Sequence, residues 1–276
     1  MIFQLFRYDF IHGIIHQWKK YIVVILITIF SCALFVLNYQ KKLNLTAVNF
    51  SDLIFWNFRG MKSADSMKSM FITSNGVWLM LNFFLSLIVG VYIKQEMSGM
   101  GQQILMKSGR KCVWWFSKCV WCIFAVLIYY FIIFLTVFII SLYTGGQAPI
   151  VQLPILQRFV NQHMEMSISN HLLATYMLQM MFVSIAISMV QMMICITCPF
   201  VLSFLFIGVV LVNAIFMTNK YSVGNMLMLI RDINQDISSS YISIICIVVV
   251  ILTMIFGSLY IKKRDIREIN MMKGGI

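Results

Sequence analysis

Two Cys-x-x-Cys pairs are the residues whose spacing comes closest to a metal site. They are Cys119 with Cys122 and Cys195 with Cys198. Four thiolates at this spacing can bind zinc, but zinc ribbons present their cysteines on turns, whereas these four lie within or beside strongly apolar segments. Cysteine in such a segment is commonly a small packing residue. We therefore predict no metal site and leave any other role of the two pairs open.

A second possible chelating pair lies near the N-terminus. His12 and His16 are four residues apart, so they share one face of a helix and could bind a metal together. Asp9 and Lys19 fall on the same face. A polar face at a membrane surface explains all four residues without a metal, and this is the interpretation we favour.

Catalytic motifs are missing from the sequence. No Gly-x-x-x-x-Gly-Lys-Ser/Thr pattern occurs, and the histidines beyond His16 are only His163 and His171. No Gly-x-Ser-Gly pattern or apolar segment with paired aspartates indicates hydrolysis within a membrane. We therefore predict that the chain is not an enzyme and holds no cofactor of its own.

Neutral polar side chains recur at helical spacing within two apolar segments, and we take them as candidates for a translocation pathway. They are Asn82 and Ser86 in one segment, and Ser184, Ser188 and Gln191 in another. Small and amide side chains also let helices pack closely and hydrogen-bond within a membrane. Helix packing and a substrate-facing seam both remain possible.

The elements that position these residues are six long apolar runs. Of the 276 residues 61% are hydrophobic and 11% charged, and the mean hydropathy is +0.89. About 20 apolar residues are needed for a helix to cross a bilayer. The strands of a membrane β-barrel alternate apolar and polar residues, and these runs are continuously apolar, so they predict helices. The sequence predicts an all-α integral membrane protein and a single transmembrane domain, with spans at about 21–38, 77–93, 119–142, 171–198, 200–217 and 241–261.

Basic residues indicate the orientation of these spans. With six spans and both termini in the cytoplasm, 13 of the 21 basic residues fall on cytoplasmic segments. The positive-inside rule therefore favours cytoplasmic N- and C-termini and a location in the cell membrane. The net charge of +12 then reflects topology, and we predict no nucleic-acid partner.

Three connecting segments have patterns of their own. Residues 1–20 predict an amphipathic helix at the membrane surface, with Phe3, Ile15 and Trp18 on its apolar face and Asp9 on its polar face. Residues 50–58 predict a short aromatic surface helix, and residues 226–230 are apolar but too short to cross. Residues 94–111 predict a short helix and a turn on the cytoplasmic side.

All 30 charged residues lie outside the six apolar runs. Carriers coupled to ions usually keep ionisable groups near the middle of the membrane. If this chain moves a solute uphill, we expect the energy to come from a separate ATPase.

The chain resembles permease subunits of the type-two ABC exporter (ABC-2) family over essentially its full length. The resemblance rests on the segment from Phe3 to Lys20, on Glu96-Met-Ser-Gly-Met-Gly-Gln-Gln-Ile-Leu105 followed by Ser108-Gly-Arg110 and Lys118, and on the apolar dip before the last span. The family's usual proline near the turn is replaced here by Ser108-Gly109. Residues 50–60 and 114–118 look like permeases of Gram-positive bacteria, some of them near antimicrobial-peptide immunity systems.

The resemblance implies a six-helix permease preceded by an amphipathic elbow helix. Its partners would be two cytoplasmic ATPase subunits, which bind ATP and Mg, and a second permease that is identical or related. Its substrate would be hydrophobic or amphipathic, such as a peptide, a lipid-linked molecule or a drug. The residues that would couple to the ATPase are Glu96, Gly99, Gly101, Gln102, Leu105, Lys107 and Arg110. A carrier or channel independent of nucleotide, and a membrane sensor or assembly factor that transports nothing, are the alternatives.

Overall fold

Long apolar helices make up almost all of the structure. The computed structural model describes residues 2–40, 42, 47–60, 76–99, 101, 111–146, 151–152, 154–156, 170–217, 222–230 and 239–263. In these residues the protein is all-α, and the only β-type contact described there is an isolated bridge between Val48 and Gly145. Apolar side chains stand out from the helices, as in Phe131 (64% exposed) and Val209 (67% exposed). Such an outer surface fits lipid, and the chain is a multi-pass membrane protein.

Five helices in the described residues are long and apolar enough to cross a membrane. Their apolar stretches are Trp18–Asn38, Gly76–Ser98, Lys111–Tyr143, Leu173–Thr197 and Tyr241–Lys263. The corresponding helices are α2 (Trp18–Phe35, followed by the π-helix η2, Val36–Gln40), α5 (Gly76–Ser98), α7 (Lys111–Tyr143), α9 (Asn170–Thr197) and α12 (Ser239–Lys263). The sixth predicted span coincides with α10 (Phe200–Phe216), whose 17 residues measure roughly 26 Å. That length is at the lower limit for a spanning helix.

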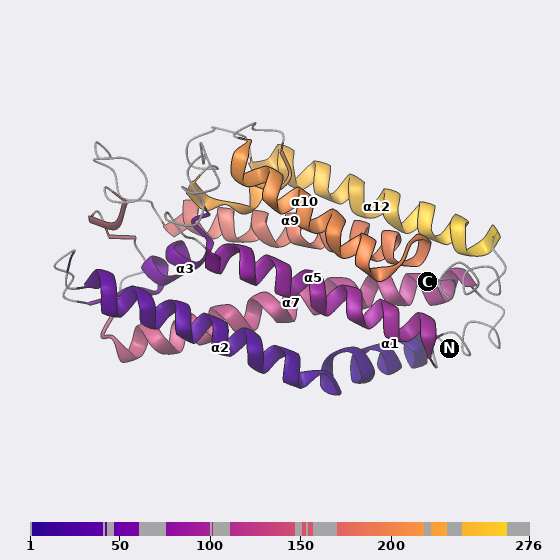
Figure 1. Ribbon diagram of the computed structural model, residues 1–276, viewed down its shortest axis with the longest axis horizontal. Helices are drawn as coiled ribbons and strands as arrows, with labels where there is room; N and C mark the ends of the chain where they lie inside the picture. Colours follow the sequence, from indigo (N-terminus) through magenta and orange to yellow (C-terminus); the bar gives the residue numbers. More distant parts are fainter. Residues whose placement is uncertain are drawn as a thin grey trace.

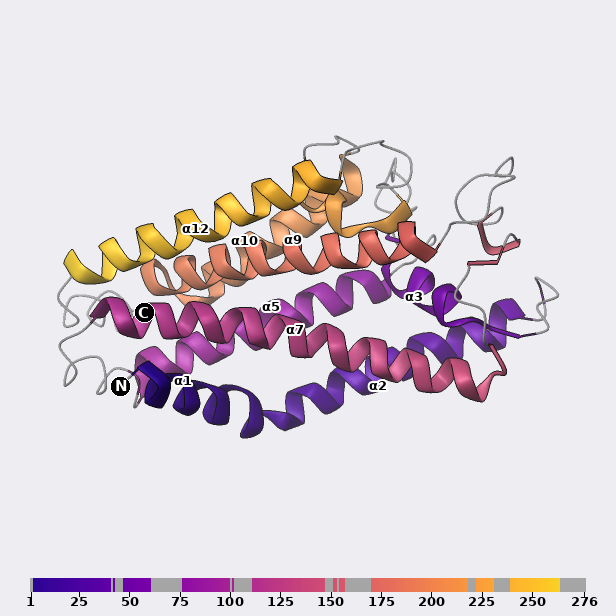
Figure 2. The same ribbon diagram turned by 180° about the vertical axis from the view of Figure 1, so that it is seen from behind.

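The helices lie side by side along the length of the molecule (Figures 1 and 2). Helix α7 packs against α2 on one side and against α9 and α12 on the other. Helix α5 contacts α9 and α10 and also touches α2 and α7. We call one end of this bundle the α1 end, where α5 and α12 finish and α7 begins, and the opposite end the α3 end.

The N-terminal segment differs from the predicted amphipathic helix. It consists of α1 (Ile2–Phe10) and a π-helix η1 (Ile11–Ile15), and α1 packs against α7. Asp9 is 1% exposed, so the prediction that it lies on a solvent-facing polar face was wrong. The cause is its buried partners, described below. Phe3 is 77% and Trp18 56% exposed, which leaves both side chains open to lipid as on an amphipathic surface helix.

The aromatic helix at the α3 end is buried, where a surface helix was predicted. Helix α3 (Phe50–Phe58) contacts α7, α2 and α5, and residues 51–60 are all buried. A capping box fixes its start, in which Asn49 and Asp52 each accept a hydrogen bond from the other's main chain. Its aromatic composition therefore reflects burial among helices.

The apolar segment before α12 packs onto α3. The 3₁₀-helix η3 (Asn225–Leu227) and the residues up to Ile230 are buried. The main-chain N–H of Ile230 donates to the carbonyl of Arg59 (2.9 Å), and Nε1 of Trp78 donates to the carbonyl of Leu227 (2.8 Å). Two loops that are far apart in the sequence thus form one buried layer at the α3 end.

This layer requires glycine at residue 60, and we expect Gly60→Ala to lower the unfolding free energy by about 3 kcal/mol. Gly60 has φ +73°, and a Cβ atom there would lie 2.4 Å from Cβ of Met228. Gly145 is the matched control, because its φ is +76° but a Cβ atom would meet nothing within 4 Å. Gly145→Ala should therefore cost only the backbone strain, about 1 to 2 kcal/mol. Equal losses in thermal unfolding would contradict the contact with Met228.

The carboxyl group of Asp52, at the α3 end, should make the stability of the protein depend on pH. Its carboxylate accepts hydrogen bonds from the main-chain N–H (2.8 Å) and side-chain amide (2.9 Å) of Gln152. Burial nevertheless raises the pKa of Asp52 to about 6. Because this value lies above the ordinary 3.8, the folded protein takes up a proton between about pH 6 and 4 that the unfolded chain does not.

Stability should therefore rise as the pH falls from 7 towards 4, by at most about 3 kcal/mol from this group. The gain is complete below the unfolded pKa and is lost as the pH rises through 6. Melting temperatures across this range should show the trend in the wild type and not in Asp52→Asn. The same slope in both proteins would assign the dependence to another group.

Candidate functional site

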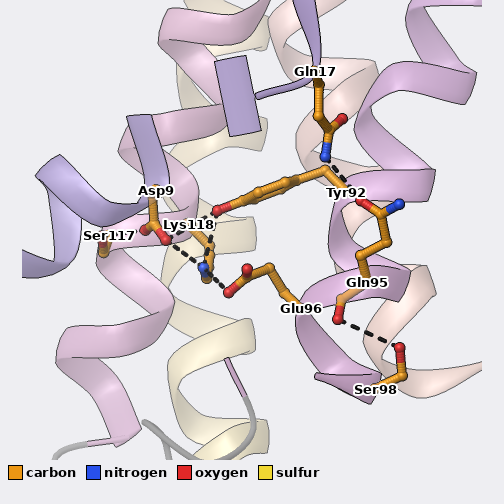
Figure 3. Close-up of polar contacts among 8 residues, drawn as sticks. All are labelled: Asp9, Gln17, Tyr92, Gln95, Glu96, Ser98, Ser117 and Lys118. Carbon is orange, nitrogen blue, oxygen red and sulfur yellow. Dashed lines mark hydrogen bonds and ion pairs between the residues drawn. The ribbon is translucent and has the colours of Figure 1, made fainter. Parts of the chain in front are cut away.

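A buried ion cluster joins three helices at the α1 end of the bundle (Figure 3). Lys118 of α7 forms salt bridges with Asp9 of α1 and with Glu96 of α5, the latter at 2.5 Å between Nζ and Oε2. The three side chains are between 1% and 7% exposed. A buried charge is tolerated only when it is paired and hydrogen-bonded, so these contacts hold the three helices in one arrangement.

The hydrogen bonds of the cluster satisfy the ammonium group completely. Nζ of Lys118 donates to both carboxylates and to the hydroxyl of Tyr92 (3.1 Å), which uses its three protons. Asp9 also accepts from Tyr92 (2.9 Å) and from Oγ of Ser117 (2.5 Å). Tyr92 and Glu96 are four residues apart on α5, which places both on the side of that helix that faces Lys118.

The cluster holds two carboxylates for one ammonium group, and burial together with this excess of negative charge raises the pKa of Tyr8. Burial raises the pKa of the Tyr8 hydroxyl, and the charges of Glu96 and Asp9 raise it further. Tyr8 therefore stays protonated at neutral pH and can serve as a donor. The surroundings are otherwise aromatic, since the ring of Trp114 lies 5.3 Å from the Lys118 ammonium.

Close packing holds the N-terminal segment against the cluster. The ring of Tyr92 stacks on Trp121 with 3.7 Å between centroids. A Cβ atom at Gly13, in η1, would lie 2.2 Å from Nε1 of Trp121 and 2.8 Å from the ring of Tyr92. The side-chain amide of Gln17 donates to Gln95 at 2.8 Å on the outer side of the same contact. The segment before α2 is thus fixed to α5 and α7 by ions, by van der Waals contact and by an exposed hydrogen bond.

The cluster lies at the base of the predicted coupling segment. Glu96 is the first of the predicted coupling residues, and a Cβ atom at Gly101 would lie 2.3 Å from its Oε2. Gly99 is described too and is exposed, and a Cβ atom there would make a tight contact, 3.0 Å from the carbonyl of Gln95. The predicted coupling residues Gln102, Leu105, Lys107 and Arg110 lie outside the described residues.

Most of this cluster was missed in the sequence. Lys118 was named as part of the family pattern and not as a buried ion, but it is 1% exposed and paired. Asp9, Tyr92 and Ser117 were not expected at the site at all. One usable signal was present, because a lysine that follows Trp114-Trp115-Phe116-Ser117 has few neighbours that could solvate it.

The five predicted pathway residues come together elsewhere, between α5, α9 and α10. Their side chains line a cavity of about 20 Å³ with Ile207 and Leu211 of α10, and the residues are Asn82, Ser86, Ser184, Ser188 and Gln191. This volume suits about one water molecule. Oγ of Ser86 and Oε1 of Gln191 have no hydrogen-bond partner within the described part of the chain, so a water there would have polar groups to bind.

Hydrogen bonds close this polar seam between the helices. Nε2 of Gln191 donates to the carbonyl of Ser86 (2.8 Å), and the hydroxyls of Tyr130 and Ser184 lie 2.7 Å apart. The contacts are those of helix packing, and the cavity is too small for a substrate in this conformation. A translocation role for the five residues stays a prediction.

The two cysteine pairs and the histidine pair all lie within the described residues. Cys119, Cys122 and Cys195 are buried, and Sγ of Cys195 lies 2.8 Å from Oγ of Ser203. The rings of His12 and His16 are 4.9 Å apart between centroids. Across the described ranges, no three His, Cys, Asp or Glu side chains are placed to hold a metal ion together.

Comparison with known proteins adds no relative to this description: no family model, no curated protein and no solved structure matches the chain.

Proposed function

We propose that this chain is the membrane-spanning subunit of an ATP-driven exporter of the type-two kind. Its substrate would be hydrophobic or amphipathic, and two cytoplasmic ATPase subunits and a second permease would complete the transporter. A peptide substrate, as in antimicrobial-peptide resistance, is the narrower form of the proposal. The observation that carries it is the position of the ion cluster around Lys118 in the chain.

The cluster clamps the connector between α5 and α7 at its base. Glu96 precedes the connector and Lys118 follows it, so their salt bridge joins its two ends. Asp9 attaches the N-terminal segment to the same ammonium group. A force applied to the connector would reach α1, α5 and α7 together, which is what a subunit driven by a separate ATPase requires.

The polar seam supplies the second part of the mechanism. It lies between α5, which leads into the connector, and α9, which packs against α5. Movement of α5 as a rigid body would change the seam that Gln191 and Ser86 now close. In this proposal ATP binding closes the ATPase pair, the connector moves, and the seam opens to admit the substrate.

Orientation follows from the same proposal. Six spans, with α10 crossing as the fifth, bring both termini to the side of the ATPase. Support comes from the basic helix ends, since α12 ends at Lys262 and Lys263 and α7 begins at Lys111, all at the α1 end. Basic residues concentrate on the cytoplasmic side of membrane proteins.

The position of the cluster also bears on the carrier alternative. Glu96 lies in the last turn of α5, so the buried ions are at the end of a helix. Ion-coupled carriers place such groups near the middle of the membrane, between broken helices. The cluster therefore supports a mechanical joint more than an ion-binding site.

Affinity purification from membranes tests the proposal. The tagged chain should retain an ATPase with a phosphate-binding loop, and the complex should hydrolyse ATP faster when substrate is present. Lys118→Ala should weaken this stimulation more than Lys19→Ala, which removes an exposed charge at the same end. Uphill solute accumulation by the isolated chain in vesicles, driven by an ion gradient, would refute the proposal.

A further inference from the structure

An open apolar groove lies between the first turns of α7 and the last turns of α12. It measures about 440 Å³, within the range of about 300 to 1,000 Å³ that is typical of clefts for small molecules. Val113 and Phe116 line it from α7, and Ile251 and Ile255 line it from α12. Among the described residues its walls contain two small polar side chains, Cys112 and Ser258, and the rest are apolar or aromatic, so its occupant must be largely apolar.

A buried tryptophan that is hydrogen-bonded to α12 forms the floor of the groove. Trp115 is 1% exposed, and its Nε1 donates to the carbonyl of Met254 at 3.0 Å. A Cβ atom at Gly257 would lie 2.3 Å from the indole ring, so glycine lets the ring lie directly against the backbone of α12. The hollow beside this ring is therefore a fixed feature of the contact between the two helices.

Two lysines lie at one end of the groove. Lys111 is one turn before Trp115 on α7, and Lys262 is one turn after Ser258 on α12, so each shares a face with a lining residue. The helices run in opposite directions, which brings both lysines to the α1 end (Figures 1 and 2). The groove thus combines an apolar trough with a basic end.

The depth of the groove matches the border between headgroups and acyl chains. Helix α7 has 33 residues, roughly 50 Å, so it extends well beyond a hydrocarbon core of about 30 Å. A lipid bound here would keep its headgroup beside the lysines and an acyl chain against Phe116 and Ile255.

We propose that this groove binds one anionic phospholipid, with the phosphate at Lys111 and Lys262 and an acyl chain in the trough. Basic sites between membrane helices bind anionic headgroups, and each lysine near such a surface contributes about 1 kcal/mol, or roughly fivefold in affinity. The site does not depend on transport, because it follows from the contact between α7 and α12 alone.

Native mass spectrometry of the full-length purified chain tests the proposal with phosphatidylglycerol and phosphatidylcholine as probes. The wild type should retain one phosphatidylglycerol molecule in preference to phosphatidylcholine. Lys262→Gln should weaken the binding of phosphatidylglycerol about fivefold and reduce the preference by the same factor. Lys19→Gln is the matched control, because Lys19 is an exposed lysine on α2, outside the groove. Equal effects of the two substitutions would overturn the proposal.

A second pair of variants tests the trough without changing charge. Ser258→Phe should fill the groove and lower the retention of phosphatidylglycerol, whereas Leu259→Phe, at a residue that is 50% exposed outside the groove, should not. Glycerol phosphate, which has the headgroup charge and no acyl chain, should not compete. Competition by glycerol phosphate would show a plain anion site and overturn the lipid assignment. A dimer of the chain that Ser258→Phe dissociates would assign the groove to a second copy and also overturn it.

Discussion

Replacing Lys118 with alanine should lower the unfolding free energy by about 3 to 5 kcal/mol, the largest loss that we expect from any single change in this chain. The substitution leaves the carboxylates of Asp9 and Glu96 buried beside each other without a cation. It also removes a donor from the hydroxyl of Tyr92. Unfolding in detergent micelles, followed by tryptophan fluorescence or by thermal aggregation, measures the loss.

A neutral version of the cluster separates charge from packing. The triple variant Asp9→Asn, Glu96→Gln and Lys118→Met keeps the side chains near their present size and removes all three charges. Replacing a buried ion pair with neutral groups is often close to neutral for stability, so this protein should recover most of the loss. Lys19→Ala, at an exposed site, should change stability by less than about 0.5 kcal/mol. If Lys118→Ala were as stable as Lys19→Ala, the cluster would not hold the helices together.

The spans were the most predictable part of the structure. The apolar runs are helical except for Cys198 and Met217 at the ends of two of them, and the first run is shared by α2 and η2. Gly76, Asn170 and Phe200 begin helices within one residue of the predicted starts at 77, 171 and 200. Long apolar segments leave a helix as the way to satisfy the backbone in lipid, so composition alone determines them. The neutral polar side chains of α5 and α9 were predictable for a related reason. Spacing of four residues places Asn82 with Ser86, and Ser184 with Ser188, on single helix faces.

The ion cluster could not be predicted in the same way. A charged residue ends an apolar run by definition, so the predicted span begins at 119, although α7 starts at Lys111 and places Lys118 two turns inside a helix. Its partner Asp9 is 109 residues away, and no local pattern records a contact of that length.

The burial of α3 was not predicted, because aromatic composition does not distinguish a surface helix from a buried one. A run such as Phe50–Phe58 suits a membrane surface and a protein interior equally well. What decides is the partner, and here the segment that follows η3, far away in the sequence, bonds through Ile230 to the carbonyl of Arg59 at the end of α3. Asp52 and Asn57 within the same helix are buried as well, which shows that polar residues at this helix are retained for their hydrogen bonds.

Gly101→Val should uncouple ATP hydrolysis from transport, which is the largest functional effect that we expect if the chain is an exporter subunit. A Cβ atom at residue 101 would lie 2.3 Å from Oε2 of Glu96 and 2.7 Å from its carbonyl oxygen. A branched side chain there must displace either the connector or the carboxylate that binds Lys118. We expect transport to fall about tenfold, within the range of single-residue effects on coupling, while basal ATP hydrolysis by the partner continues.

The control for this prediction is Gly76→Val, because a Cβ atom at Gly76 would meet nothing within 4 Å. Gly76 begins α5, at the opposite end of that helix from Glu96. Both variants should insert into the membrane in similar amounts, and an ATPase should co-purify with each. Gly99→Ala should have an intermediate effect, since its added Cβ atom would lie 3.0 Å from the carbonyl of Gln95, a tight contact that small shifts can relieve. Normal transport by Gly101→Val, with Glu96 and Lys118 intact, would mean that force does not pass through this connector and that the ion cluster serves stability alone.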